Sequence, residues 1–145
     1  LLSEVQQLKQ SQENTEKEKQ EIEQIKSSIK VTKIWASNPN SAGGVDLYIN
    51  WKNLSDKIIK YAYFTVIPYN SVNDIVNCTI RHYSRFNAQD EGPYSKGQGT
   101  KGTEYYWENA WYNYSIKSVK LESVRIIYMD GTILDIPEKY IDYIN

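Results

Sequence analysis

The side chains that most often act as a general base or a nucleophile are scarce in this sequence. It contains one histidine, His82, and one cysteine, Cys78, and no nucleophile-elbow pattern accompanies them. Cys78 alternates with Val76 and Ile80 on a predicted strand that also carries His82, so both are expected to be structural. One His and one Cys cannot close a tetrahedral zinc site without two carboxylates. We therefore expect no catalytic residue, no metal site and no cofactor.

Four carboxylates lie near each other in the second half of the chain. Asp90, Glu91, Glu104 and Glu108 fall in or beside a long glycine-containing connection. With backbone carbonyls they could hold Ca²⁺, which prefers oxygen ligands. No Asp-x-Asp spacing supports such a site, and a solvated rim of the domain is the alternative interpretation.

Aromatic residues give the clearest indication of function. Six of them fall within ten residues: Tyr105, Tyr106, Trp107, Trp111, Tyr112 and Tyr114. If strand alternation places Tyr105, Trp107 and Trp111 in the core, then Tyr106, Tyr112 and Tyr114 are left as an exposed surface. Exposed tyrosines stack on sugar rings or anchor protein partners. The alternative is that tyrosine is simply a favourable strand residue here.

Charge and cysteine content exclude several classes of protein. The formal net charge is -1, with 17 Lys plus Arg against 18 Asp plus Glu. A nucleic-acid partner is not expected, because phosphate neutralisation requires a surplus of clustered cations. A single cysteine allows no intrachain disulfide.

The first 30 residues differ in composition from the rest of the chain, since they contain no Gly, Pro or aromatic residue. A heptad register predicts a helical stalk that forms a weak homo-oligomer. A single solvated helix is the alternative. The residues of the predicted seam are Leu1, Leu8, Ile22, Ile25 and Ile29. The sequence begins Leu1-Leu2-Ser3 without Met, so we expect a piece of a longer protein, with any membrane attachment made through an upstream segment.

From residue 31 onward the apolar periodicity is two, which predicts a second unit, a β domain over residues 31–145. Its strands are predicted at residues 31–36, 44–52, 57–69, 75–83, 104–112, 116–129 and 132–136. Residues 85–103 are predicted as a connection, and residues 138–144 as a short C-terminal helix. Seven short strands without intervening helices predict an antiparallel, immunoglobulin-like β-sandwich, with a small closed barrel as the competitor. We expect residues 31–137 to fold without the N-terminal helix.

Two stretches carry a resemblance to known domains. Residues 53–57 through Val66-Ile67-Pro68-Tyr69-Asn70, followed by residues 73–76, resemble the central strand, turn and next strand of bacterial FxLYD-type domains. The connection at Gly92-Pro93, residues 106–112 and the 128–132 hairpin are similar to a related bacterial domain of unknown function. This resemblance implies an immunoglobulin-like sandwich on a cell-envelope protein without assigned activity.

Together these observations predict a binding or spacer module without catalysis, in a bacterial envelope or secreted protein, with a protein or carbohydrate partner. The alternative is a receptor- or carbohydrate-binding tip of an oligomeric fibre on a helical stem. The absence of disulfides leaves a cytoplasmic location open.

Overall fold

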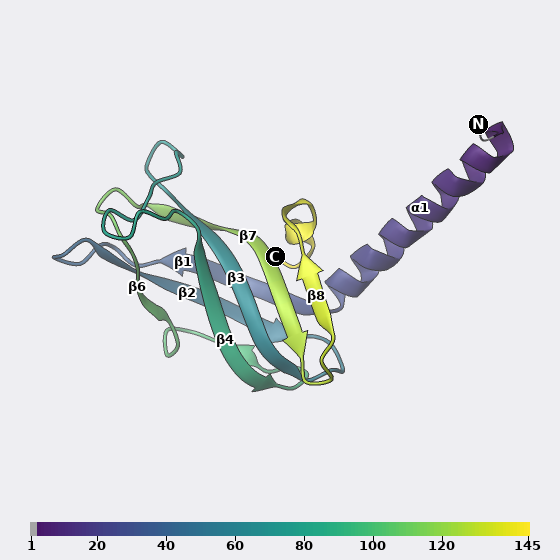
Figure 1. Cartoon of the computed structure of the whole chain (residues 1–145). Coiled ribbons are helices and arrows are strands. Elements are labelled where there is room, and N and C mark those ends of the chain that lie inside the picture. Colours follow the sequence, from purple (N-terminus) through teal and green to yellow (C-terminus); the bar gives the residue numbers. More distant parts are fainter. Residues whose placement is uncertain (1–2) are drawn as a thin grey trace.

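A computed structural model, which describes residues 3–145, shows a mainly β protein with one long N-terminal helix. Two antiparallel four-strand sheets pack as a sandwich (Figure 1). The elements are, in chain order, α1 (Glu4–Lys26), β1 (Ile29–Ala36), β2 (Gly44–Asn53), β3 (Ile59–Tyr69), β4 (Phe86–Tyr94), β5 (Gly99–Thr100), β6 (Trp107–Tyr112), β7 (Ser118–Tyr128), β8 (Ile133–Ile136) and a C-terminal 3-10 helix, η1 (Glu138–Tyr143).

The sheets have simple antiparallel topology. In sheet A, β2 pairs with β1 along one edge and with both β5 and β6 along the other. In sheet B the order is β4-β3-β7-β8, and an Asp130-Gly131 turn joins β7 to β8 as the sequence predicts. Apolar residues on alternate positions of each strand face the space between the sheets. On β2 these inward residues are Val45, Leu47, Ile49 and Trp51.

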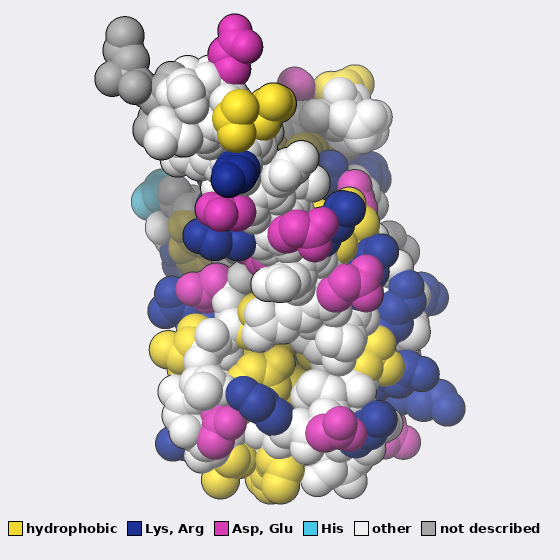
Figure 2. Space-filling model, turned by 90° about the vertical axis from the view of Figure 1, so that its right-hand side faces the viewer, with side chains coloured by type: hydrophobic (Ala, Val, Ile, Leu, Met, Phe, Trp, Pro, Cys, Tyr) yellow, Lys and Arg dark blue, Asp and Glu magenta, His cyan; other side chains and the backbone are white. Residues whose placement is uncertain are grey.

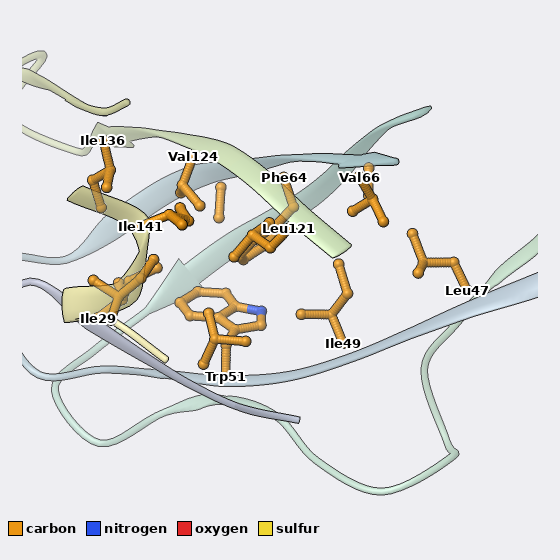
Figure 3. Packing of buried hydrophobic residues seen from close by; sticks show 14 of the residues in the cluster. Ile29, Leu47, Ile49, Trp51, Phe64, Val66, Leu121, Val124, Ile136 and Ile141 are labelled. Carbon is orange, nitrogen blue, oxygen red and sulfur yellow. The ribbon is translucent and has the colours of Figure 1, made fainter. Parts of the chain in front are cut away.

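Trp51 lies at the centre of the core. Its side chain points from β2 toward Phe64 and Leu121 of sheet B (Figure 3). The Trp51 and Phe64 ring centroids are 5.6 Å apart, at an angle of 55°. Both rings are almost fully buried, so they contribute a large apolar area on the order of 150–250 Å² each.

The helix α1 leaves the sandwich at one end and extends away from both sheets (Figure 1). At 1.5 Å per residue, its 23 residues span about 35 Å. Ser3 caps its first turn in a capping box with Gln6, and every residue from 4 to 21 is exposed. Most of α1 is therefore a solvated helix, which agrees with its polar composition.

The part of α1 that packs against the domain is its C-terminal end, residues 22–26. Ile25 is fully buried, Ile22 packs partly against the core, and Ile29 is a buried residue of β1 rather than of the helix. The prediction that these residues form one seam with Leu8 is wrong for Ile25 and Ile29, because the sandwich already covers them. Leu8 is 63% exposed, and Leu1 lies outside the described residues.

The C-terminus closes the same end of the sandwich. Tyr140, Ile141 and Ile144 are buried with Ile29, and the N–H of Val31 donates to the carbonyl of Ile144 at 2.7 Å. Core side chains thus come from both sides of the predicted 31–137 unit. The expectation that those residues form a complete core by themselves therefore needs correction.

The predicted strand at residues 75–83 is also wrong, since this segment forms turns with a single bridge from Tyr69 to Ile75. The partner of β3 is instead β4, within the stretch predicted as a connection. The sequence of β4, FNAQDEGPY, contains Gly92, Pro93 and two acids, which obscured its periodicity. Ala88 and Asp90 are its inward residues.

The packing between the end of α1 and the sandwich predicts that truncating Ile29 and truncating Leu8 will have very different effects on the free energy of unfolding. Ile29→Ala removes fully buried methyl groups and should lower the free energy of unfolding by about 2–4 kcal/mol. Leu8→Ala, on the free part of α1, should change it by less than about 0.5 kcal/mol. Urea denaturation followed by tryptophan fluorescence measures both. Equal stabilities for the two variants would contradict the packing described here.

Candidate functional site

The histidine and cysteine do not form a reactive pair. His82 is exposed on a turn with a positive φ of 64°, not on a strand, and it shares no hydrogen bond with the thiol of Cys78. Cys78 is fully buried, as predicted. Burial raises the pKa of its thiol, but N–H donors of Arg81 and Tyr112, 3.5 and 3.4 Å from Sγ, outweigh this and lower the pKa below its usual value.

The predicted carboxylate cluster is dispersed. Among residues 3–145, no group of three or more His, Cys, Asp or Glu side chains is placed to hold a metal ion. Asp90 lies in the core, whereas Glu91, Glu104 and Glu108 are exposed. The Ca²⁺ interpretation therefore has no geometric support in this part of the chain, and Asp90 has a different role.

Asp90 joins the two sheets inside the core. Its Oδ2 accepts from Trp51 Nε1 at 2.9 Å, and its Oδ1 accepts from the Tyr94 hydroxyl at 2.6 Å. Desolvation raises the pKa of Asp90 above the usual carboxyl value, although both hydrogen bonds act in the opposite direction. Burial and the neighbouring carboxylate likewise raise the pKa of Tyr94. Asp90 is a buried structural acceptor, and no Lys or Arg among residues 3–145 forms an ion pair with it.

A stack of aromatic rings crosses the outer face of sheet A. Trp35 of β1 stands opposite Tyr48 of β2, with ring centroids 4.9 Å apart and planes within 8°. Tyr106 stacks on the other side of Tyr48 at 5.3 Å and 28°. The ammonium of Lys33 lies 4.3 Å from the centroid of Trp35. We call Trp35, Tyr48 and Tyr106 the aromatic ladder.

The ladder leaves one ring face available. Tyr48 is covered on both sides, while Tyr106 is 43% exposed and has no second aromatic or cationic neighbour among the described residues. The other two tyrosines of the predicted surface do not join it. Tyr112 is half-buried beneath Arg81, and Tyr114 is exposed where it packs against Gly43 and donates its hydroxyl to the carbonyl of Ser41. Of the predicted set, only Tyr106 belongs to the ladder.

A hollow lies beside the ladder at the β5 edge of sheet A, where Pro93 and Tyr94 of β4 also line it. Its volume is about 720 Å³, and its lining includes Thr32, Asn50, Lys52, Gln98 and Lys101. We call these residues the polar hollow. Asn50 follows Tyr48 by two positions on β2, so the two side chains share the outer face about 7 Å apart. Asn50 Oδ1 is a buried side-chain oxygen without a hydrogen-bond partner in the part of the chain that the structure describes.

The charge around the polar hollow is of one sign. Its lining contains Lys52 and Lys101 and no acidic residue, and neither lysine forms an ion pair among residues 3–145. Elsewhere the signs are mixed: Figure 2 shows cationic and acidic side chains interspersed over the side from which α1 projects. The hollow is thus a local cationic site on a nearly neutral protein.

Several residues of this face could have been found from the sequence. The alternation of β2 places Tyr48, Asn50 and Lys52 on its polar face, as the observed strand does. Trp35 was obscured by a bulge between Val31 and Lys33, which reverses the side-chain alternation of β1. Lys101 follows β5, a two-residue strand with no periodic signal of its own.

The comparisons with known proteins add no relative. No family model, no curated protein and no solved structure matches this chain. No helix of the described residues is long and apolar enough to span a membrane. Function is therefore inferred from the geometry of the site.

The position of Asp90 predicts a pH effect with a definite sign. A carboxyl whose pKa is higher in the folded than in the unfolded state contributes stability at low pH, and this contribution is lost as the pH rises through the folded pKa. Asp90→Asn keeps an acceptor for Trp51 Nε1 and removes the desolvated charge. The stability of Asp90→Asn relative to the parent should therefore increase between about pH 3.5 and pH 7.

The matched variant Asp90→Leu leaves Trp51 Nε1 and the Tyr94 hydroxyl unpaired in the core, and should cost about 1–3 kcal/mol for each donor at pH 7. Thermal unfolding of both variants across this pH range measures these effects. A leucine variant as stable as the asparagine variant would show that Asp90 does not act as the core acceptor.

Proposed function

We propose that this chain is a non-catalytic binding module and that it holds a saccharide on the outer face of sheet A. The observation that carries this proposal is the contiguity of the aromatic ladder with the polar hollow. Saccharides offer both apolar ring faces and hydroxyl groups. A site that combines an aromatic face with amide, hydroxyl and ammonium groups complements both features.

The ladder supports this proposal because it fixes Tyr106 in place. A ring that is already stacked on Tyr48 loses little conformational entropy when a ligand covers its opposite face. Thr32, Asn50 and Gln98 then supply acceptors and donors within the adjoining hollow. A protein partner is the competing interpretation of an exposed tyrosine.

We further propose that the sandwich is of the immunoglobulin-like type. The strand orders β1-β2-β6 and β4-β3-β7-β8 support this. Without the two-residue β5, the sandwich has seven main strands. The second of them, β2, pairs with the fifth, β6, in one sheet, and the third, β3, pairs with the sixth, β7, in the other. In this comparison β5 counts as an addition to the edge of β2. The resemblance to FxLYD-type domains, and with it a bacterial envelope or secreted location, rests on sequence pattern alone, and fold does not fix function.

Affinity gel electrophoresis tests the binding proposal. The chain is run through gels that contain xylan, dextran or polygalacturonate, and retardation by at least one polymer is expected. Tyr106→Ala should weaken that binding about three- to tenfold, since one stacking contact is lost. Tyr61→Ala, an outward residue of sheet B, is the matched control. Retardation by none of the polymers, or equal loss in the two variants, would contradict the proposal.

The exposed part of α1 favours a second function, that of a stem. Val5 and Leu8 are 61% and 63% exposed on a helix that projects from the sandwich. A partner helix from a second copy could cover them, as in a fibre tip on an oligomeric stem.

Sedimentation equilibrium tests the stem. We expect dimers or trimers with a dissociation constant in about the micromolar range or weaker, because the apolar residues of α1 are few. Leu8→Asp should abolish this association without affecting the sandwich, which Leu8 does not contact. If the parent is a monomer at about 100 μM, the helix is a spacer and not a stem.

A further inference from the structure

The polar side chains of the hollow indicate one chemical group that the ligand must bring. Thr32, Asn50 and Gln98 line the hollow, and each of these side chains can both donate and accept a hydrogen bond. A sugar hydroxyl also does both, so it complements all three.

The lysines indicate a second group. Lys52 and Lys101 line the same hollow, whose lining includes no acidic side chain, and neither lysine forms an ion pair in the described chain. Lys33, which stands opposite Asn50 on β1, adds a third ammonium group on this face. A neutral ligand would leave the net positive charge of the hollow uncompensated. An anionic group placed between the lysines would form charge-assisted hydrogen bonds.

The dimensions leave room for more than one sugar ring. The hollow, at about 720 Å³, falls within the range of small-ligand pockets, about 300–1,000 Å³. The ladder begins about 7 Å away along β2, at Tyr48. One ring in the hollow and another toward Tyr106 would occupy both parts of the face.

We propose, building on the proposed function, that the ligand is an anionic oligosaccharide. Its anionic group lies between Lys52 and Lys101, its hydroxyl groups bond the polar side chains that line the hollow, and a further ring stacks on Tyr106. The cationic hollow thus selects among saccharides by charge. The nearly neutral surface elsewhere limits non-specific attraction of polyanions.

Isothermal titration of the full chain tests this assignment. The probes are polygalacturonate and hyaluronate as carboxylated polymers, dextran sulfate as a sulfated one, and methyl-esterified pectin and dextran as neutral ones. We expect binding to an anionic probe and at least tenfold weaker binding to the neutral ones. Preference for the carboxylated or the sulfated probe identifies the anionic group.

Two charge reversals provide the matched comparison. Lys101→Glu, at the hollow, should weaken binding of the anionic probe about tenfold or more, because it removes a charge-assisted hydrogen bond. Lys120→Glu, an exposed lysine of β7 in sheet B, makes the same change of net charge and should alter binding less than about twofold.

The outcomes separate the two proposals. Binding of a neutral polymer that depends on Tyr106 but not on Lys101 would overturn the anionic assignment and leave the saccharide-binding function intact. Equal weakening by Lys101→Glu and Lys120→Glu would also overturn it, since the attraction would then be diffuse. No binding of any probe at about 1 mM would overturn both.

Discussion

The hydrogen bond from Trp51 to Asp90 is the interaction on which the rest of the structure depends. It joins β2 of sheet A to β4 of sheet B through the centre of the core. Tyr94 completes it by donating to the other carboxylate oxygen and by meeting the Trp51 ring at 4.9 Å and 74°. Both oxygens of a buried carboxylate are thereby satisfied, and the Trp51 side chain is held to sheet B by a directional bond as well as by packing.

Trp51 also connects the core to the proposed binding face. The backbone of Trp51 pairs with Thr100, and this pairing holds β5 and the adjoining Lys101 at the edge of β2. The approach is close: a Cβ at Gly99 would lie 1.8 Å from the Trp51 carbonyl oxygen. The polar hollow is therefore built on the strand that carries Trp51, while its lysines remain exposed at the rim.

The elements that could be predicted from the sequence are those with a clear apolar periodicity. The strands β2, β3 and β7 could be predicted because apolar residues alternate along them, and the heptad pattern was sufficient for α1. The strand β4 was missed because a buried Asp90 and a Gly92-Pro93 pair break the pattern. Apolar alternation predicts a strand over residues 75–83, yet these residues lack a partner strand in the described structure and form turns. For the site, strand alternation predicted an exposed Tyr106. It also placed Tyr105 in the core, which is wrong, because Tyr105 precedes β6 and is 43% exposed. The ladder required knowledge of which strands are neighbours, which a single sequence does not contain.

The central claim is that the outer face of sheet A is the binding surface of this protein. Amide chemical-shift changes during a titration with oligogalacturonate test it most directly, because they report every residue at once. The account predicts changes confined to residues 33–35, 48–52 and 98–106. Changes centred on the 70–85 segment at the opposite end from α1, or on the outer face of sheet B around Tyr63 and Arg125, would contradict it.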